Sequence, residues 1–239
     1  MALCSISTVN SVNIKSISKP PAPLPNYFYS FTNSSVLSCG YILNSSSGLY
    51  DLSAINITTS NFFANGIYLP ASPSTYCLLN SITTSNYFTI VQKYTKSANT
   101  DNRLFTIRNV TNNTGFNIRL SGSGLVGQHI QSNNTAYGTS GLINTNNTDT
   151  LVCVYSASNY MCYTNANSAG VSFGNDYTNN NYGNTMRVAI GVWWYPDVAA
   201  GSNYSAADNT QLVNLFRFYN RAFTSTEITN ALAGTYPSS

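Results

Sequence analysis

The sequence predicts an all-β protein, an antiparallel sandwich or barrel with one short helix near its C-terminus. From residue 26 onward, short apolar-periodic runs alternate with clusters of Asn, Ser, Gly and Thr, which is typical of strands joined by turns. The chain has a single Glu and only four Lys among its 239 residues, so the composition of a helical bundle is missing. Aromatic residues make up 13% of the chain, enough to build a core, and disorder is therefore not expected.

Residues 1–25 are predicted to form a separate arm before the sandwich. Ser5–Ile17 places β-branched residues between small polar ones, and prolines follow at positions 20, 21, 23 and 25. Such a proline run prefers an extended polyproline conformation and cannot join a central sheet. We expect the arm to dock by strand addition onto another copy of the chain or onto a different assembly or capsid protein. The alternative interpretation is a frayed tail.

Twelve strands are expected in the single domain that spans residues 26–239. Several alternate apolar and polar residues, as where Phe116, Ile118 and Leu120 are separated by polar residues. This period of two predicts one buried face on each strand. The expected strands are Tyr27–Phe31, Leu52–Thr58, Thr75–Thr83, Tyr87–Tyr94, Arg103–Arg108, Phe116–Leu120, Leu125–Ile130, Thr150–Tyr155, Tyr160–Tyr163, Val171–Phe173, Met186–Trp193 and Gln211–Tyr219.

One helix is expected after the last strand. Thr224 and Glu227 have the spacing of a capping box, in which the threonine caps the helix and the glutamate reaches back to the free N–H. Ile228 and Leu232 then fall on one face, and Gly234 can end the helix after about two turns. This short helix is expected to pack on the sandwich.

Neutral polar residues replace charge on the expected surface. Asn, Ser and Thr fill 92 positions, whereas charged residues make up 7% and the net charge is +3. This charge is too small to predict a nucleic-acid partner, and no apolar run approaches the roughly 18 residues of a membrane span. A surface with little long-range repulsion suits a protein that is held in an assembly or at an exposed surface.

The N-terminal 19 residues do not predict a secretory signal, because they lack a basic start and an apolar central region. Eight N-x-S/T sequons occur. With so many Asn, Ser and Thr residues, about eight are expected by chance, so the sequons are no evidence for secretion. We therefore expect a virion or extracellular location that is reached by assembly.

The five cysteines are widely spaced and include no CxxC pair. With one histidine in the chain, a zinc site is not predicted. Cys153 and Cys162 flank an expected hairpin, and a loop at 156–159 would place them opposite each other. They are interpreted as two small buried core thiols. A cross-strand disulfide is the alternative.

The run LVNLFRFYNRAFTSTEITNAL at 212–232 resembles the final strand and short helix of the concanavalin A-like lectin/glucanase family, in its laminin-G-like branch. Looser similarities, in chain order, are the opening strand at 27–31, a strand within 61–69, a hairpin within 150–167 with Asn165 near the family asparagine, and Ala189–Gly191. The residues that match the C-terminal motif are Tyr219, Asn220, Arg221, Ala222, Glu227 and Ile228.

This resemblance implies a two-sheet jelly roll, and its members include lectins, glucanases and adhesion or structural modules. A glucanase of this family carries Glu-x-Asp-x-x-Glu on one strand, and glycoside hydrolysis needs two carboxylates that flank the bond. Here the single Glu has a capping role, and no two of the six Asp lie closer than eleven residues. The sole histidine, His129, has no GxSxG elbow beside it. We therefore expect that this protein is not an enzyme.

Two ligand sites are considered in the Asn-rich and Trp-containing segments. Calcium needs several oxygen ligands, which Asp176–Asn181 could supply, although a polar, solvated loop is the favoured interpretation. No other cofactor or metal is expected. A sugar needs an aromatic platform beside amide groups, and core packing or subunit contact are the alternatives for these aromatic residues. The candidates for the sugar site are Trp193, Trp194, Tyr195, Asp197, Tyr182 and Tyr204.

The favoured function from the sequence is a non-enzymatic structural or surface component of a virion or another extracellular assembly. The low charge, the N-terminal arm and the lack of clustered catalytic groups support it. The alternative is a carbohydrate-binding module that recognises a glycan or a receptor, and a glycoside hydrolase is the least favoured class.

Overall fold

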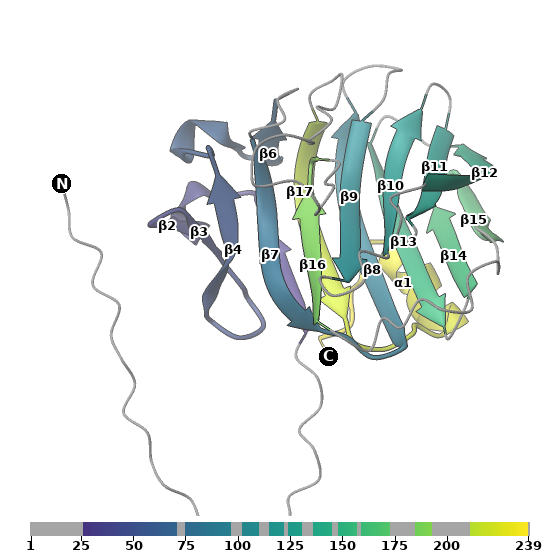
Figure 1. Cartoon of the computed structure of the whole chain (residues 1–239). Coiled ribbons are helices and arrows are strands. Elements are labelled where there is room, and N and C mark those ends of the chain that lie inside the picture. The colour runs from purple at the N-terminus through teal and green to yellow at the C-terminus, as the bar shows by residue number, and fades with distance from the viewer. Residues whose placement is uncertain are drawn as a thin grey trace, which may run out of the picture.

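The computed structural model describes most of the expected domain. The described residues are 26–70, 75–96, 102–109, 115–121, 124–130, 136–144, 148–156, 159–172, 185–192 and 211–238. They form two antiparallel sheets that face each other, with one helix on the outer side of one sheet (Figure 1). This arrangement confirms the predicted two-sheet sandwich. The predicted arm at residues 1–25 lies outside the described residues.

The sheet that carries the helix has eight strands and is called the helix-side sheet. Strands β1 and β6 both pair with β17, and the short strand β5 follows β6 at the edge. In order across the sheet, the strands are β15 (Asn167–Ser172), β14 (Asn159–Thr164), β13 (Thr148–Ser156), β8 (Tyr87–Lys96), β17 (Gln211–Tyr219), β6 (Gly66–Leu69) and β5 (Phe62–Phe63), with β1 at Tyr27–Ser30.

The second sheet has nine strands. Two 3-10 turns, at Ser34–Val36 and Thr59–Asn61, precede its edge strand β2 and strand β5 of the helix-side sheet. In order across the second sheet, the strands are β12 (Ala136–Asn144), β11 (Gly124–Ile130), β10 (Gly115–Ser121), β9 (Asn102–Asn109), β16 (Thr185–Ile190), β7 (Tyr76–Thr83), β4 (Tyr50–Ile55), β3 (Tyr41–Leu43) and β2 (Leu37–Ser38).

The main core lies between the sheets and is rich in aromatic rings. Phe88 of the helix-side sheet stacks on Phe218 and Tyr155, with ring centroids 5.3 Å and 5.0 Å apart. It also stacks on Phe116 of the second sheet. Because alternate residues of a strand point to opposite faces, the neighbours of these rings face outward. The outward Val91 and its counterparts on β13 and β17 form a smaller core under the helix.

The helix α1 (Ser225–Leu232) covers part of the outer face of the helix-side sheet. Its buried residues Ile228, Ala231 and Leu232 pack on that smaller core. The Thr224 side chain accepts a hydrogen bond from the Glu227 N–H, and the Glu227 side chain accepts one from the Thr224 N–H, so the predicted capping box is confirmed. No helix in the described part of the chain is long and apolar enough to span a membrane.

The expected hairpin around Cys153 and Cys162 is also present. The two residues are directly opposite in the register of β13 and β14, and both are free, buried thiols. Burial and the neighbouring Cys162 thiol raise the pKa of Cys153 above its ordinary value. The interpretation as buried core thiols is confirmed.

The structure contains strands that the sequence did not predict. Strands β2, β3 and β5 have only two or three residues each, too few to show a period of two. Strand β12 has the sequence AYGTSGLIN, whose Gly, Ser and Thr content is typical of turns. Strand β6 was indicated only by the family resemblance. The expected strand Met186–Trp193 is shorter in the structure, where β16 ends at Ile190. The next residue, Gly191, has a φ of 88°, which is not an extended conformation.

Candidate functional site: a polar pocket beside the helix

The aromatic residues proposed from the sequence as a sugar platform lie outside the described residues. This holds for Trp193, Trp194, Tyr195, Asp197, Tyr182 and Tyr204, and also for the calcium candidates at 176–181. Those hypotheses stay predictions. Among the described residues, no group of three or more His, Cys, Asp or Glu side chains could hold a metal ion.

A different site is visible where the end of α1 meets the outer face of the helix-side sheet. It is an open pocket of about 350 Å³. Strands β8 and β13 supply one side, the turn after β14 supplies Asn165, and the end of α1 supplies the rest. The lining residues are Lys93, Thr148, Asp149, Thr150, Asn165, Leu232, Ala233 and Gly234.

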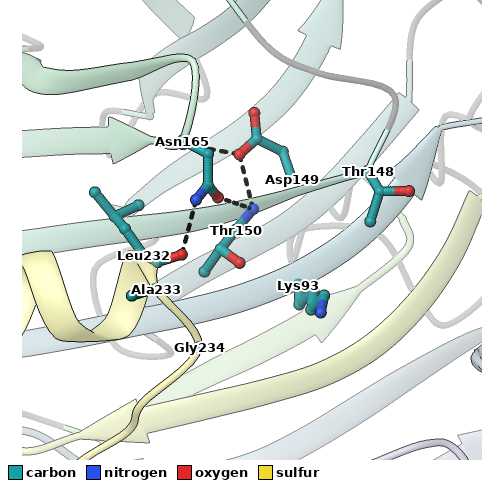
Figure 2. A pocket seen from close by; sticks show the side chains of 8 residues that line it. All are labelled: Lys93, Thr148, Asp149, Thr150, Asn165, Leu232, Ala233 and Gly234. Carbon is teal, nitrogen blue, oxygen red and sulfur yellow. Dashed lines mark hydrogen bonds between the residues drawn. The ribbon is translucent and has the colours of Figure 1, made fainter.

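Asp149 and Asn165 form a fixed polar wall of this pocket (Figure 2). The Asp149 Oδ1 atom accepts hydrogen bonds from the backbone N–H groups of Thr150 and Asn165, both at 2.8 Å. Asn165 Nδ2 donates to the backbone carbonyl of Leu232 at 2.7 Å, and Asn165 Oδ1 accepts from the Thr150 N–H at 3.0 Å. Because buried polar groups are costly unless they are paired, this network holds the helix end against the hairpin.

The side of the pocket that β8 and β13 supply also presents groups that can still bind a ligand. Lys93 is half-buried, and it forms no ion pair or hydrogen bond with the rest of the described chain. Thr148 is exposed, and its hydroxyl lies 3.0 Å from that of Thr95. A hydroxyl carries one donor and two acceptor sites, so Thr148 retains bonding capacity. The pocket therefore offers an ammonium donor beside a hydroxyl on a preformed surface.

Tyr236 extends this polar region beyond the helix end. Its ring lies under the Arg217 guanidinium, whose carbon is 4.7 Å from the ring centroid. Burial raises the pKa of Tyr236 above its ordinary value of 10. The phenol is therefore neutral at physiological pH and can donate a hydrogen bond.

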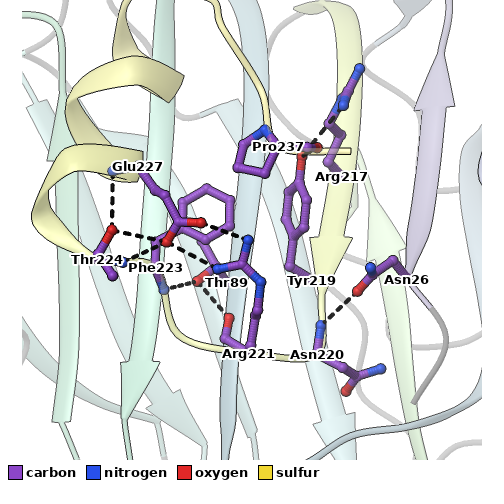
Figure 3. A network of polar contacts seen from close by, with 10 residues as sticks. All are labelled: Asn26, Thr89, Arg217, Tyr219, Asn220, Arg221, Phe223, Thr224, Glu227 and Pro237. Carbon is purple, nitrogen blue, oxygen red and sulfur yellow. Dashed lines mark hydrogen bonds and ion pairs between the residues drawn. The ribbon is translucent and has the colours of Figure 1, made fainter. Parts of the chain in front are cut away.

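The single glutamate of the chain has a structural role (Figure 3). Glu227 pairs with Arg221 at 2.7 Å, and its Oε2 atom accepts hydrogen bonds from the Thr224 N–H at 2.8 Å and the Arg221 guanidinium at 3.0 Å. These contacts lower the pKa of Glu227 to about 2, with the Arg221 hydrogen bond as the largest cause. Thr89 ties the same segment to β8, because its hydroxyl donates to the Arg221 carbonyl and accepts from the Phe223 N–H.

The carboxylate of Asp51 is also used within the fold. It accepts hydrogen bonds from the Tyr29 hydroxyl at 2.6 Å and from Asn44 Nδ2 at 3.0 Å. Burial and the nearby Asp51 carboxylate raise the pKa of Tyr29 far above its ordinary value. Asp51, Asp149 and Glu227 are thus each held by structural contacts, and the described residues contain no evident acid–base pair. The arrangement is suited to binding.

Sequence reasoning identified only part of this site. Asn165 was singled out through the family hairpin, whereas Lys93 and Thr148 were not. A usable signal was present, because Lys93 interrupts the apolar residues of its strand at an outward position. Its partners, however, lie about 55 to 140 residues away in the chain.

Comparisons with known proteins show the fold. No family model and no curated protein match the chain. Among solved structures, the binding domain of botulinum neurotoxin serotype D is similar with a TM-score of 0.57 and 9% identity, over 87% of this chain and 51% of that one. A sialidase of Trypanosoma rangeli gives a TM-score of 0.59 and 13% identity, over 90% of this chain and 34% of that one. The chain thus spans about half of the toxin domain and one third of the sialidase.

Proposed function

We propose that this chain is a non-catalytic carbohydrate-binding module. Its fold is similar to that of two proteins with a connection to sialic acid. The toxin binding domain has been solved in complex with N-acetylneuraminic acid, and the sialidase has been solved in complex with sialic acid. At these low identities the likeness concerns the fold alone, and the pocket itself supports binding.

The pocket at the end of α1 is the observation that carries the proposal. Small ligands bind in concave, largely preformed sites with a few well-placed polar groups. Lys93 and Thr148 supply such groups, and the hydrogen bonds of Asp149 and Asn165 hold the adjoining part of the pocket in place. A volume of about 350 Å³ lies at the lower end of the usual range for ligand pockets, which suits a single sugar unit.

The structural uses of the described carboxylates support binding without hydrolysis. A glycosidase needs one carboxyl group as acid and a second as nucleophile or base. Glu227 has a lowered pKa and an arginine partner, which makes it a poor general acid at neutral pH. We expect no turnover of a bound glycan, which a product assay by chromatography checks.

The toxin domain and the sialidase give no support to the assembly interpretation of the sequence. It stays a prediction that rests on residues 1–25. The virion or extracellular location is likewise a prediction.

A glycan array with the full chain tests the proposed function. We expect binding to one class of glycans, including sialylated ones, and loss of that binding in Lys93→Met. Lys93→Arg is the matched control, because it keeps a cation on a long apolar stem. Both variants should unfold at the temperature of the parent protein. An array without signal, or a Lys93→Met variant that binds as the parent does, would contradict the proposal.

A further inference from the structure

We infer that the binding surface continues from the pocket across the outer face of the helix-side sheet to an aromatic pair, Phe63 and Tyr68. The ligand is then an oligosaccharide chain that spans both ends of this surface. This inference rests on the proposed function, because it assigns a second subsite to the same glycan.

The register of the sheet places one continuous row of side chains between the two ends. Thr148 is opposite Thr95, Thr95 is opposite Leu212, and Leu212 is opposite Tyr68. Side chains of directly opposite residues share a face of the sheet. The sequence neighbours of these residues, such as Tyr94, are buried between the sheets. The row therefore faces outward.

The aromatic end of the row is exposed and held in place. Phe63 is 51% exposed and Tyr68 is 39% exposed, and their rings meet edge to face with centroids 6.2 Å apart. The Asn61 side chain donates to the Tyr68 carbonyl at 3.2 Å, and the Asn214 side chain donates to the Asn65 carbonyl. The two rings are in contact with each other, and aromatic rings with an apolar body are common anchors of ligands.

The length of the row determines the class of ligand. Tyr68 and Thr148 are three strands apart, so their Cα atoms are separated by about 14 Å at the usual strand spacing. This is longer than one six-membered sugar ring. The row between the two ends consists of the uncharged Leu212 and Thr95, with Lys93 as the cation at the pocket end. A chain of sugars has hydroxyl groups and apolar ring faces, which match the polar pocket end and the apolar and aromatic remainder of this row.

A peptide strand is a poorer occupant of the aromatic end. Strand addition needs a row of free backbone groups at a sheet edge, and the edge strand β5 contains only Phe62 and Phe63. The exposed groups here are side chains on a face. A protein partner is therefore an outcome that the experiment must detect, and it is not the occupant we infer.

The test measures affinity by calorimetry against a series of increasing chain length, from a monosaccharide to a pentasaccharide of the class found on the array. The full chain should bind the pentasaccharide about tenfold more tightly than the monosaccharide. The double variant Phe63→Ala with Tyr68→Ala should bind all lengths with the monosaccharide affinity. Tyr87→Ala is the matched control, because Tyr87 is equally exposed but lies six residues from Lys93 on β8, about 20 Å away.

The outcomes separate this inference from the proposed function. Binding that requires Lys93 but does not depend on chain length would overturn the extended surface and leave the pocket in place. The double variant could also keep its affinity for long glycans but change its sedimentation. That result would identify the aromatic pair as a protein contact and would overturn the extended glycan surface too. If no glycan binds at all, both proposals fall. If the double variant unfolds, the single variant Tyr68→Thr is used to repeat the affinity measurements, because threonine is favourable in strands.

Discussion

Replacing Thr224 by alanine would remove the hydroxyl group that caps α1. That hydroxyl accepts a hydrogen bond from the Glu227 N–H at 3.3 Å and donates one to the Glu227 carboxylate at 3.0 Å. Loss of such a cap costs about 1 kcal/mol of unfolding free energy, and for a chain of this size that corresponds to a fall of about 2–4 °C in Tm. Thermal unfolding followed by circular dichroism measures it, and Thr224→Ser is the control that keeps the hydroxyl.

The carboxylate at the same helix start can be separated into two roles. Glu227→Gln keeps an acceptor for the Thr224 N–H but loses the ion pair with Arg221, which is partly exposed and therefore contributes about 0.2–1 kcal/mol. Glu227→Ala loses both contacts and should be the less stable of the two. Glycan binding should be unchanged in each folded variant. If Glu227→Gln abolished binding at unchanged Tm, the structural assignment of the only glutamate would be refuted.

The stability that Glu227 contributes should depend on pH with a definite sign. Its pKa is about 2 in the folded protein, below its ordinary value of 4.5. The ionised group thus stabilises the folded state above about pH 4.5, and this contribution is lost as the pH falls towards 2. The difference in Tm between the parent protein and Glu227→Gln should shrink over that interval, and also in high salt. A difference that persisted at pH 2 would refute the electrostatic explanation.

Three further predictions concern other parts of the chain. Gly115→Ala should unfold the protein or lower its Tm strongly, because an added Cβ would lie 2.1 Å from the Ile107 carbonyl oxygen; soluble yield and Tm measure this. The facing thiols of Cys153 and Cys162 should react with a thiol reagent only after denaturant is added, because they are buried; rapid labelling of the folded protein would contradict that. Deletion of residues 1–19 should leave a soluble, folded sandwich that no longer joins an assembly, as circular dichroism and native size would show.

Features that depend on neighbouring residues could be predicted from the sequence. The period of two in β10 comes from Phe116, Ile118 and Leu120, which are separated by polar residues, and it predicts the face that enters the core, where Phe116 and Ile118 lie. The capping box is similarly local, because Thr224 and Glu227 are three residues apart. The C-terminal motif could be recognised for the same reason. Its Arg221 and Glu227 are six residues apart and form an ion pair.

Features that depend on strand pairing could not be predicted. The edge strand β5 has two residues, and its pairing with β6 decides that Phe63 and Tyr68 meet on the surface. The pocket joins Lys93 of β8 to Thr148 of β13 through a register set by many backbone hydrogen bonds.

The sequence by itself determined the class of fold, the helix with its cap and the facing cysteines, because each follows from the alternation or spacing of nearby residues. Only the tertiary structure decided where the pocket lies. Asn165 closes one wall because its amide reaches the Leu232 carbonyl, 67 residues later in the chain. Such contacts depend on how the sheet and helix pack, and a one-residue change of register would turn Lys93 toward the core.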